Sequence, residues 1–268
     1  MRADGTSAAL SDDAFLGGRL HLLQPRKGAR AGTDAVLLAA SVAQPPEEPA
    51  RILEAGCGSG AVALCLAWRL PRVHVTGVEI DSDLCELTRR NAERNGLSQH
   101  VAVVHGDVRG PFSALEAEGI RREGYDHVVA NPPYLPAGRS RAPANADKQQ
   151  AHVMAPGELG EWVRFLAACA APRGRLWLIH RADALPDLLA ALKGRFGGVR
   201  LFPLFPRAGA PATRIIISGR KGSRAGLKLL PGLVMHDSDG RYTPAAEASL
   251  RDGAPLPQET PDDAGDTL

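Results

Sequence analysis

Cysteine and aromatic residues are scarce in this sequence. The 268 residues include four cysteines, and no two of them form a C-x-x-C pair. Such spacing argues against a structural zinc site and against a disulfide framework, so we expect no bound metal. Phenylalanine, tryptophan and tyrosine together make up only 4% of the residues, which makes each aromatic residue beside a motif informative.

Long apolar runs and a strong charge of one sign are also missing. No apolar stretch approaches the roughly 20 residues that a bilayer-spanning helix needs. Residues 1–13 are polar and acidic and lack the apolar core of a secretion signal. We therefore expect a cytoplasmic protein without a membrane partner. The net charge of +2 neither indicates nor excludes a nucleic-acid partner, because basic residues can be clustered on one face.

From Arg51 onward, apolar runs of strand length alternate with longer amphipathic stretches. This alternation predicts right-handed β-α-β units and a parallel sheet with helices on both faces. The last two strands are joined by a loop too short for a crossover helix, so they should pair antiparallel at one edge. The expected fold is α/β and Rossmann-like, with a mostly parallel seven-stranded sheet and an antiparallel edge strand. We expect strands at 51–55, 73–79, 101–105, 125–130, 175–180, 199–202 and 213–218, and helices at 61–70, 83–95, 161–171 and 182–193.

The two ends of the chain differ in composition from this core. Residues 1–13 and the Pro-, Gly- and Asp-rich residues 251–268 are expected to be disordered. Between them, residues 14–250 are expected to form the folded domain, which opens with a hairpin and helix segment. Near its end, Leu227–His236 is expected to add a further edge strand.

A glycine-rich loop, Glu54-Ala55-Gly56-Cys57-Gly58-Ser59-Gly60, follows the first expected strand. In a doubly wound sheet, ligands bind outside the carboxyl ends of the strands, where Gly56, Gly58 and Gly60 would let the backbone approach a ligand closely. The spacing G-x-G-x-G differs from the dinucleotide pattern G-x-G-x-x-G. The acidic Glu54 would repel a pyrophosphate but attract a cation. The loop therefore favours S-adenosylmethionine, which carries sulfonium and ammonium groups, over NAD.

Two further acidic residues stand at the ends of the next two expected strands. Glu79 ends the second strand, where its carboxylate can accept hydrogen bonds from both ribose hydroxyls of such a cofactor. Asp107 follows the third strand, where it can accept a hydrogen bond from the amino group of the cofactor adenine. Either residue alone is as easily a solvated charge. Together with Glu54, acids at successive strand ends predict a site for S-adenosylmethionine.

The tetrapeptide Asn131-Pro132-Pro133-Tyr134 directly follows the fourth expected strand. An exocyclic amine such as the 6-amino group of adenine is a poor nucleophile, because its lone pair is delocalised into the ring. Two acceptors for its N–H groups, the Asn131 side-chain oxygen and the Pro132 carbonyl, would act most strongly in the transition state. The prolines hold both acceptors rigid, and Tyr134 offers a ring for base stacking worth about 1–3 kcal/mol. The tetrapeptide predicts methyl transfer to a planar amine, with Asn131 beside both cofactor and substrate.

The region from Gln24 to Ser218 resembles class I methyltransferases with the N-P-P-Y signature, and more narrowly the bacterial tRNA1(Val) adenine-N(6)-methyltransferase family. The narrower resemblance rests on the segment R-A-G-T-D-A-V-L-L-A at positions 30–39 and on Phe205-Pro206-Arg207 ahead of the final strand. It implies a tRNA substrate, methylated on the adenine just 3′ of the anticodon. In that family the Gly-Thr-Asp segment closes over the methionine end of the cofactor, which implies this role for Thr33 and Asp34. The same two residues precede an apolar run, as helix-start residues do.

Basic residues that could meet an RNA backbone are distributed along the whole chain. Each alone is most simply a solvated surface charge, whereas those flanking the tetrapeptide are placed where a substrate must approach. The set comprises Lys27, Arg30, Arg139, Arg141, Lys148, Arg207, Arg214, Arg220, Lys221, Arg224 and Lys228.

Three alternatives stay open. A protein glutamine-N(5) methyltransferase acts on an equally planar nitrogen, but such enzymes carry a helical domain ahead of the cofactor loop, and the short stretch before Glu54 lacks that pattern. An RNA guanine-N(2) methyltransferase would use the same tetrapeptide. A non-catalytic subunit that binds S-adenosylmethionine or RNA is disfavoured by the intact tetrapeptide.

Overall fold

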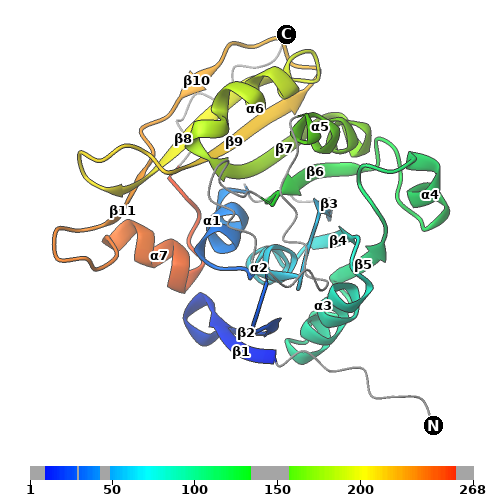
Figure 1. Cartoon of the computed structure of the whole chain (residues 1–268), viewed down its shortest axis with the longest axis horizontal. Helices are drawn as coiled ribbons and strands as arrows, with labels where there is room; N and C mark the ends of the chain where they lie inside the picture. Colours follow the sequence, from blue (N-terminus) through cyan, green and yellow to red (C-terminus); the bar gives the residue numbers. More distant parts are fainter. Residues whose placement is uncertain (1–9, 29, 43–48, 134–156, 258–268) are drawn as a thin grey trace, which may run out of the picture.

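The computed structural model of the chain describes residues 10–28, 30–42, 49–133 and 157–257. Within these residues nine strands form one sheet, in the order β10-β8-β9-β7-β6-β3-β4-β5, with β11 also paired to β8 (Figure 1). All of its pairs are parallel except those of β9 with β7 and β8. The strands are β3 Ala50–Ala55, β4 Val73–Glu79, β5 Val101–His105, β6 Tyr125–Ala130, β7 Ala170–Arg181, β8 Phe196–Arg207, β9 Arg214–Lys221, β10 Lys228–Leu229 and β11 Leu233–His236.

This topology confirms the predicted α/β fold with its mostly parallel sheet and antiparallel pair. The antiparallel strand β9 is not at the edge, as expected, but two positions in from it, between β7 and β8, because β10 and β11 pair with the outer side of β8. Strand β8 spans 196–207, well beyond the expected 199–202, because β9 pairs with one side of it and β10 and β11 pair with the other. The expected edge strand over 227–236 is present but interrupted around Gly232, where an added Cβ would lie 2.3 Å from the Pro203 carbonyl oxygen.

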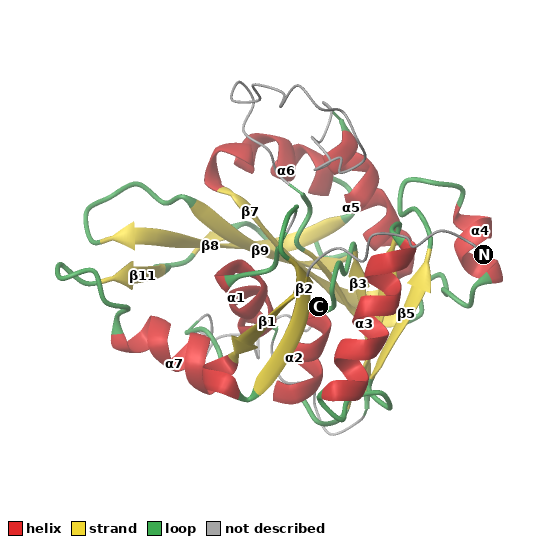
Figure 2. Cartoon of the chain, turned by 60° about the horizontal axis from the view of Figure 1, so that its bottom comes forward, coloured by secondary structure: helices red, strands yellow, loops and turns green. Residues whose placement is uncertain are grey.

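Helices cover both faces of the sheet. Figure 2 shows α5 and α6 on one side and α1, α2 and α7 on the other. Because successive strand side chains point to opposite faces, Ile52 and Val129 belong to one core and Leu53 and Val128 to the other. The first core is covered by α1 Thr33–Ser41, α2 Ala61–Arg69, α3 Ser82–Arg94 and α7 Pro244–Asp252, and the second by α4 Phe112–Ala117, α5 Glu158–Cys169 and α6 Leu185–Leu192, with short 3-10 turns at Leu16–Gly18 (η1) and Ala182–Ala184 (η2). None of the helices in the described ranges is long and apolar enough to cross a membrane.

The described parts of the chain ends are ordered, which corrects the expectation of disorder there. Strand β1, Leu10–Phe15, begins before residue 14. At the other end, α7 continues to Asp252, and Leu256 is buried with its N–H donating to the Ala40 carbonyl at 3.0 Å. The polar composition of residues 251–268 concealed this contact, because a single buried leucine does not change the average of the segment.

Two asparagines on α3 hold the N-terminal hairpin, β1 with β2 Leu20–Pro25, against the sheet domain. The Asn91 carboxamide accepts from the Leu23 N–H at 2.8 Å and donates to the Leu23 carbonyl at 2.9 Å. The Asn95 carboxamide does the same for His21, at 2.9 and 2.8 Å. Asn91 and Asn95 are four residues apart on a helix, and their partners are two residues apart on a strand; both separations span about 6 Å. The two asparagines therefore hydrogen-bond to the edge of β2 as a neighbouring strand would. Asn91 also donates to the Ser59 carbonyl at 3.0 Å, which joins the hairpin to the glycine loop.

Replacing Asn91 by alanine is expected to lower the free energy of unfolding by about 1–3 kcal/mol, because it strips partners from the part-buried Leu23 backbone groups and from the buried Ser59 carbonyl. Asn95 lies at the exposed end of the same ladder, where water replaces the lost bonds. Asn95→Ala is therefore the matched control, with an expected loss below about 1 kcal/mol. Urea unfolding of both variants measures the difference, and equal losses would contradict the ladder.

Candidate cofactor and substrate site

The carboxyl ends of β3, β4, β5 and β6 meet at one edge of the sheet, which we call the carboxyl edge. Their registers pair Ala55 with both Val78 and Ala130, so the ends of the three central strands lie side by side. Neighbouring strands are about 4.8 Å apart. The acidic loop after β3, the acids after β4 and β5 and the tetrapeptide after β6 are thereby brought to the edge at which doubly wound sheets bind ligands.

The glycine loop is fixed by hydrogen bonds to β4 and α3. The Gly56 and Cys57 N–H groups both donate to the Val78 carbonyl, at 2.8 and 3.1 Å. The Gly58 carbonyl accepts from the Thr88 hydroxyl at 2.8 Å. Both β4 and α3 therefore contribute to the shape of the loop, and the sequence pattern did not indicate the Thr88 contact.

The three motif glycines all have positive φ, at +66°, +56° and +86° for Gly56, Gly58 and Gly60. An added Cβ at Gly56 would lie 2.5 Å from the ring of Trp162 on α5, and one at Gly60 would lie 2.9 Å from Thr88. At Gly58 nothing lies within 4 Å of that position. The first and third glycines are needed for packing, whereas the second leaves an open approach to the backbone, as a ligand requires.

Glu54 is a buried carboxyl group beside this loop. Its side chain is 2% exposed, and Oε2 has no hydrogen-bond partner in the described part of the chain. Burial raises the pKa of Glu54 well above its ordinary value, the Ala63 N–H that donates to it opposes the rise, and the nearby Glu79 adds to it. A buried, unsatisfied carboxyl oxygen is costly in the free protein, and a bound cation would supply the missing partner.

Glu79 ends β4 with its side chain 7% exposed. Oε2 accepts from the Gly58 N–H at 2.8 Å, and Oε1 accepts from the Ile80 and Asp81 N–H groups at 2.9 and 3.0 Å. These bonds hold the carboxylate at the mouth of the loop. Ile80, which follows, is 54% exposed, an apolar surface beside the acids that sequence reasoning did not single out.

Asp107 lies at the same edge but is already paired. Its Oδ1 accepts from the Arg109 N–H at 2.9 Å and from the Arg109 Nε at 3.2 Å. Arg109 also donates to Glu158 at the start of α5, at 2.9 Å. The carboxylates raise the pKa of Arg109. The network joins the loop after β5 to α5 and orients the Asp107 carboxylate.

Asp107→Ala is expected to weaken cofactor binding by about 1 kcal/mol, which is a loss of about fivefold in affinity. This is the usual contribution of one hydrogen bond. The effect stays small because the carboxylate already has Arg109 as a partner in the free protein. Calorimetry measures the affinity, with Asp187→Ala on the exposed surface of α6 as the control. Unchanged affinity would remove Asp107 from the cofactor site.

Asn131 directly follows β6, and its side-chain Oδ1 is buried without a hydrogen-bond partner in the described residues. Pro132 after it is buried as well. A rigid, unpaired acceptor is therefore ready for a donor from outside the chain. Tyr134 lies outside the described residues, as do Arg139, Arg141 and Lys148.

Thr33 and Asp34 form the first turn of α1, with Gly32 rather than either of them at the N-cap. Asp34 accepts from Arg214 at the start of β9, at 2.9 Å. The structure therefore places Thr33 and Asp34 at the carboxyl edge but beside β9, two strands from β6. Other basic residues also have acidic partners, Arg30 with Asp13 and Lys221 with Glu123.

Comparisons with known proteins agree with this arrangement. Residues 30–149 match the methyltransferase small domain family. A release factor glutamine methyltransferase from Moorella thermoacetica is 32% identical over 183 residues, 65% of this chain and 62% of that protein. Among solved structures, an Agrobacterium tumefaciens protein described as a predicted O-methyltransferase has a TM-score of 0.70 at 30% identity, over 83% of this chain and 97% of that one. A tRNA1(Val) (adenine(37)-N6)-methyltransferase from Porphyromonas gingivalis is 32% identical over 241 residues, 87% of this chain and 91% of the relative.

The chain belongs to the tRNA1(Val) (adenine(37)-N6)-methyltransferase family. It is an S-adenosylmethionine-dependent N-methyltransferase, which confirms the cofactor predicted from the acidic loop.

The four cysteines of this methyltransferase are free and buried. Burial raises the pKa of Cys65 and of Cys169 to about 12. The pKa of Cys57, in the glycine loop, is also raised by burial and then by Glu54 and Glu79. These thiols remain protonated and serve as packing groups, since the thiolate is the nucleophile. No group of three or more potential metal ligands occurs in the part of the chain that the structure describes.

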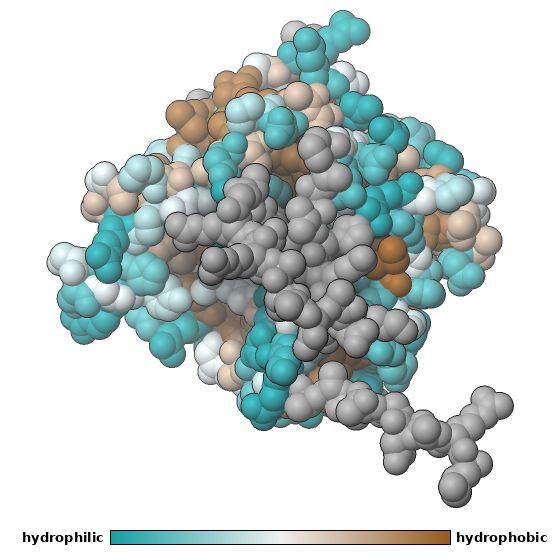
Figure 3. Space-filling model, in the orientation of Figure 1, coloured by the Kyte–Doolittle hydropathy of each residue, from teal (hydrophilic) through white to brown (hydrophobic). Residues whose placement is uncertain are grey.

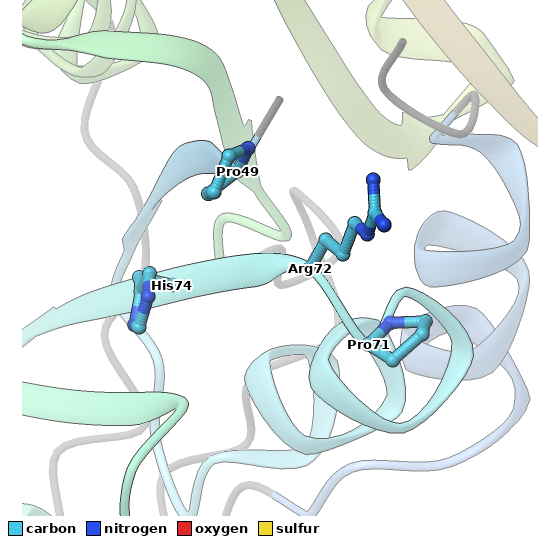
Figure 4. Close-up of a pocket in the computed structure, with 4 residues that line it drawn as sticks. All are labelled: Pro49, Pro71, Arg72 and His74. Atoms are coloured by element: carbon cyan, nitrogen blue, oxygen red, sulfur yellow. The ribbon is translucent and has the colours of Figure 1, made fainter. Parts of the chain in front are cut away.

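A separate pocket of the methyltransferase lies at the opposite edge of the sheet, where β3 and β4 begin. Figure 4 shows it lined by Pro49, Pro71, Arg72 and His74. Strand beginnings lie a whole strand length from the glycine loop, so this pocket is not part of the cofactor site.

Proposed function

We propose that this methyltransferase transfers a methyl group to the 6-amino group of an adenine in tRNA, next to the anticodon. The observation that carries the proposal is the buried, unpaired Oδ1 of Asn131 at the end of β6, one strand from the unpaired Oε2 of Glu54. The first atom is an acceptor for a planar amine and the second a partner for a cation. The Porphyromonas gingivalis relative, named for adenine 37 of tRNA1(Val), supports this substrate.

The residues of the carboxyl edge fit S-adenosylmethionine. Glu54 would face its positive charge, the backbone at Gly58 is open to it, and Glu79 would accept from its ribose hydroxyls. Asp107 would accept from its adenine amino group, and the exposed Ile80 offers an apolar face for its adenine ring. Thr33 and Asp34 are assigned to its methionine end. When bound, the cofactor supplies an electrophilic methyl group on a sulfonium.

Asn131 and Pro132 would act on the substrate amine. The Asn131 Oδ1 and the Pro132 carbonyl accept its two N–H groups, which makes the nitrogen more tetrahedral and its lone pair available for in-line attack. The consecutive prolines keep both acceptors in place before the substrate arrives. No strong general base is needed, because the methylated amine can lose its proton afterwards. Tyr134 is assigned to stacking on the extruded base.

Glutamine methylation is the second candidate, supported by the Moorella thermoacetica relative. A side-chain amide nitrogen is planar, and the same acceptors would serve it. The described residues ahead of β3 form a hairpin and the single helix α1, not a helical domain that would hold a protein substrate.

Methyl transfer from labelled cofactor to three acceptors decides between these functions. The acceptors are unmodified tRNA with an adenine at position 37, duplex DNA, and a glutamine-containing protein substrate. Transfer to the tRNA alone, giving N(6)-methyladenine, is the expected result. Transfer only to the protein amide would overturn the tRNA substrate and leave the fold and the cofactor unchanged. A tRNA substrate also assigns the enzyme to the cytoplasm.

A further inference from the structure

The carboxyl end of β8 extends beyond its antiparallel partner β9. Leu204 on β8 pairs with Arg214, the first residue of β9, and β8 then runs on to Arg207. Three residues of strand add about 10 Å. Strand β11 pairs with this extension, His236 opposite Arg207, and a turn follows up to Tyr242. We call residues 205–207 and 233–242 the ledge; it stands at the outer end of β8 and β11 in Figures 1 and 2.

The ledge is held rigidly by the C-terminal segment. The Thr243 hydroxyl donates to the Val234 carbonyl at 2.7 Å and caps α7 by accepting from the Ala246 N–H at 3.2 Å. A ring nitrogen of His236 lies 3.1 Å from the Pro206 carbonyl oxygen. Helix α7 packs in turn against α1 and η1. A surface fixed in this way can bind a partner without the entropy cost of being ordered first.

Three arginines stand on the opposite side of Asn131 from the acids of the cofactor site. The acids of the cofactor site lie on the side of β3, β4 and β5. On the other side, Arg181 ends β7 and is paired in register with Arg214 of β9, and Arg207 ends β8. Arg181 and Arg214 are bonded to Asp183 and Asp34. Arg207 is exposed and forms no ion pair within the described ranges, so its charge is available to an anion.

An aromatic pair stands beside Arg207. The rings of His236 and Tyr242 are stacked with centroids 4.7 Å apart and an interplanar angle of 25°. Both side chains are partly exposed. The whole chain has only three tyrosines. Figure 3 shows that hydrophilic and hydrophobic residues alternate over the face it presents, without one large apolar patch. Aromatic rings next to arginine are how proteins hold unpaired nucleotides, by stacking and by phosphate contact.

The distance between Asn131 and the ledge also fits a single-stranded stretch of RNA. Strand β8 is the third strand from β6, through β7 and β9, which places it about 14 Å away along the edge. An RNA loop that presents one base at Asn131 would pass its next few nucleotides over the arginines toward the ledge.

We propose that the ledge binds the RNA strand that flanks the target adenine. Arg207 contacts a backbone phosphate, and the His236–Tyr242 pair stacks against an unpaired base. This inference rests on the proposed function and assigns residues 233–242 to substrate binding.

The test compares Arg207→Glu with Arg89→Glu, a charge reversal on the exposed surface of α3, beside β5 at the other end of the sheet from β8. Affinity for unmodified tRNA is measured as a function of salt, together with KM and kcat for methyl transfer, cofactor affinity and melting temperature. Arg207→Glu should weaken tRNA binding by about tenfold and lower the slope of log K against log salt by about one, with KM affected and kcat retained. Arg89→Glu should match the wild type in tRNA affinity, salt slope, KM, kcat and cofactor affinity, and only its melting temperature should fall, because the ion pair with Glu86 is lost.

The aromatic pair has its own comparison. Tyr242→Leu should weaken tRNA binding by about tenfold, whereas Tyr242→Phe keeps the ring and should bind as the wild type does. If the wild type methylates tRNA and Arg207→Glu and Tyr242→Leu both bind it unchanged, the ledge proposal is wrong and the proposed function stands. If the wild type transfers no methyl group to any tRNA, the proposed function fails, and the ledge proposal fails with it.

Discussion

Asn131→Ala should cut turnover by about 100- to 1,000-fold while S-adenosylmethionine affinity stays within about twofold. The side-chain Oδ1 is buried and unpaired in the free protein, so removing it deletes an interaction made with the substrate amine and strengthened in the transition state. Single-turnover transfer to tRNA measures the chemical step, and calorimetry measures cofactor binding.

Asn131→Asp is the informative companion variant. Its carboxylate keeps an acceptor oxygen at the same place, so it should retain more activity than the alanine variant if accepting the amine N–H is what matters. Equal melting temperatures confirm that both variants fold. Near-normal turnover of Asn131→Ala would refute the amine-polarising mechanism.

Glu54→Gln is expected to weaken S-adenosylmethionine binding by about 10- to 100-fold, the size of one charge-assisted interaction in a buried site. The amide has almost the shape of the carboxyl, and its oxygen can still accept from the Ala63 N–H. What disappears is the negative charge that faces the cationic cofactor.

The same substitution should leave the free protein at least as stable as the wild type. The pKa of Glu54 is raised in the folded state by burial. A group with a raised folded pKa contributes stability that is complete below its unfolded pKa and is lost as the pH rises through the folded value. The wild type should therefore lose stability as the pH rises above about 4.5, the ordinary pKa of a glutamate, and Glu54→Gln should lose less.

Thermal unfolding from pH 5 to pH 8, without and with S-adenosylmethionine, separates the two effects. The expected pattern is a flatter pH profile for free Glu54→Gln and a smaller cofactor-induced rise in its melting temperature. A variant that is strongly destabilised at pH 8 and binds the cofactor normally would show that Glu54 is a structural residue.

Local pattern predicted the central strands closely. The bounds of β4, β5 and β6 are those expected from the sequence, because apolar runs between polar turns are visible within a few residues. Helix α7 was missed although Thr243, Pro244 and Gly253 are ordinary start and stop signals. Its apolar face is only Ala246 and Leu250, too narrow a stripe to stand out in a polar segment.

The sequence by itself determined the order of chemical groups along one edge of the sheet. Glu54, Glu79, Asp107 and Asn131 each end or follow a strand, and parallel strands bring their carboxyl ends together, so their proximity follows from the alternating pattern alone.

Only the tertiary structure decided which partners these groups have. Asp107 is bonded to Arg109, Asn91 joins the hairpin to the glycine loop, and Arg207 stands on a strand extended by a segment about thirty residues further along the chain. None of these contacts has a periodic signature, because each joins side chains or backbone edges that come together only when separate elements pack. Whether a polar group is charged and whether it has a hydrogen-bond partner depend on that packing. The unpaired Glu54 and Asn131 oxygens could therefore be recognised only in the folded chain.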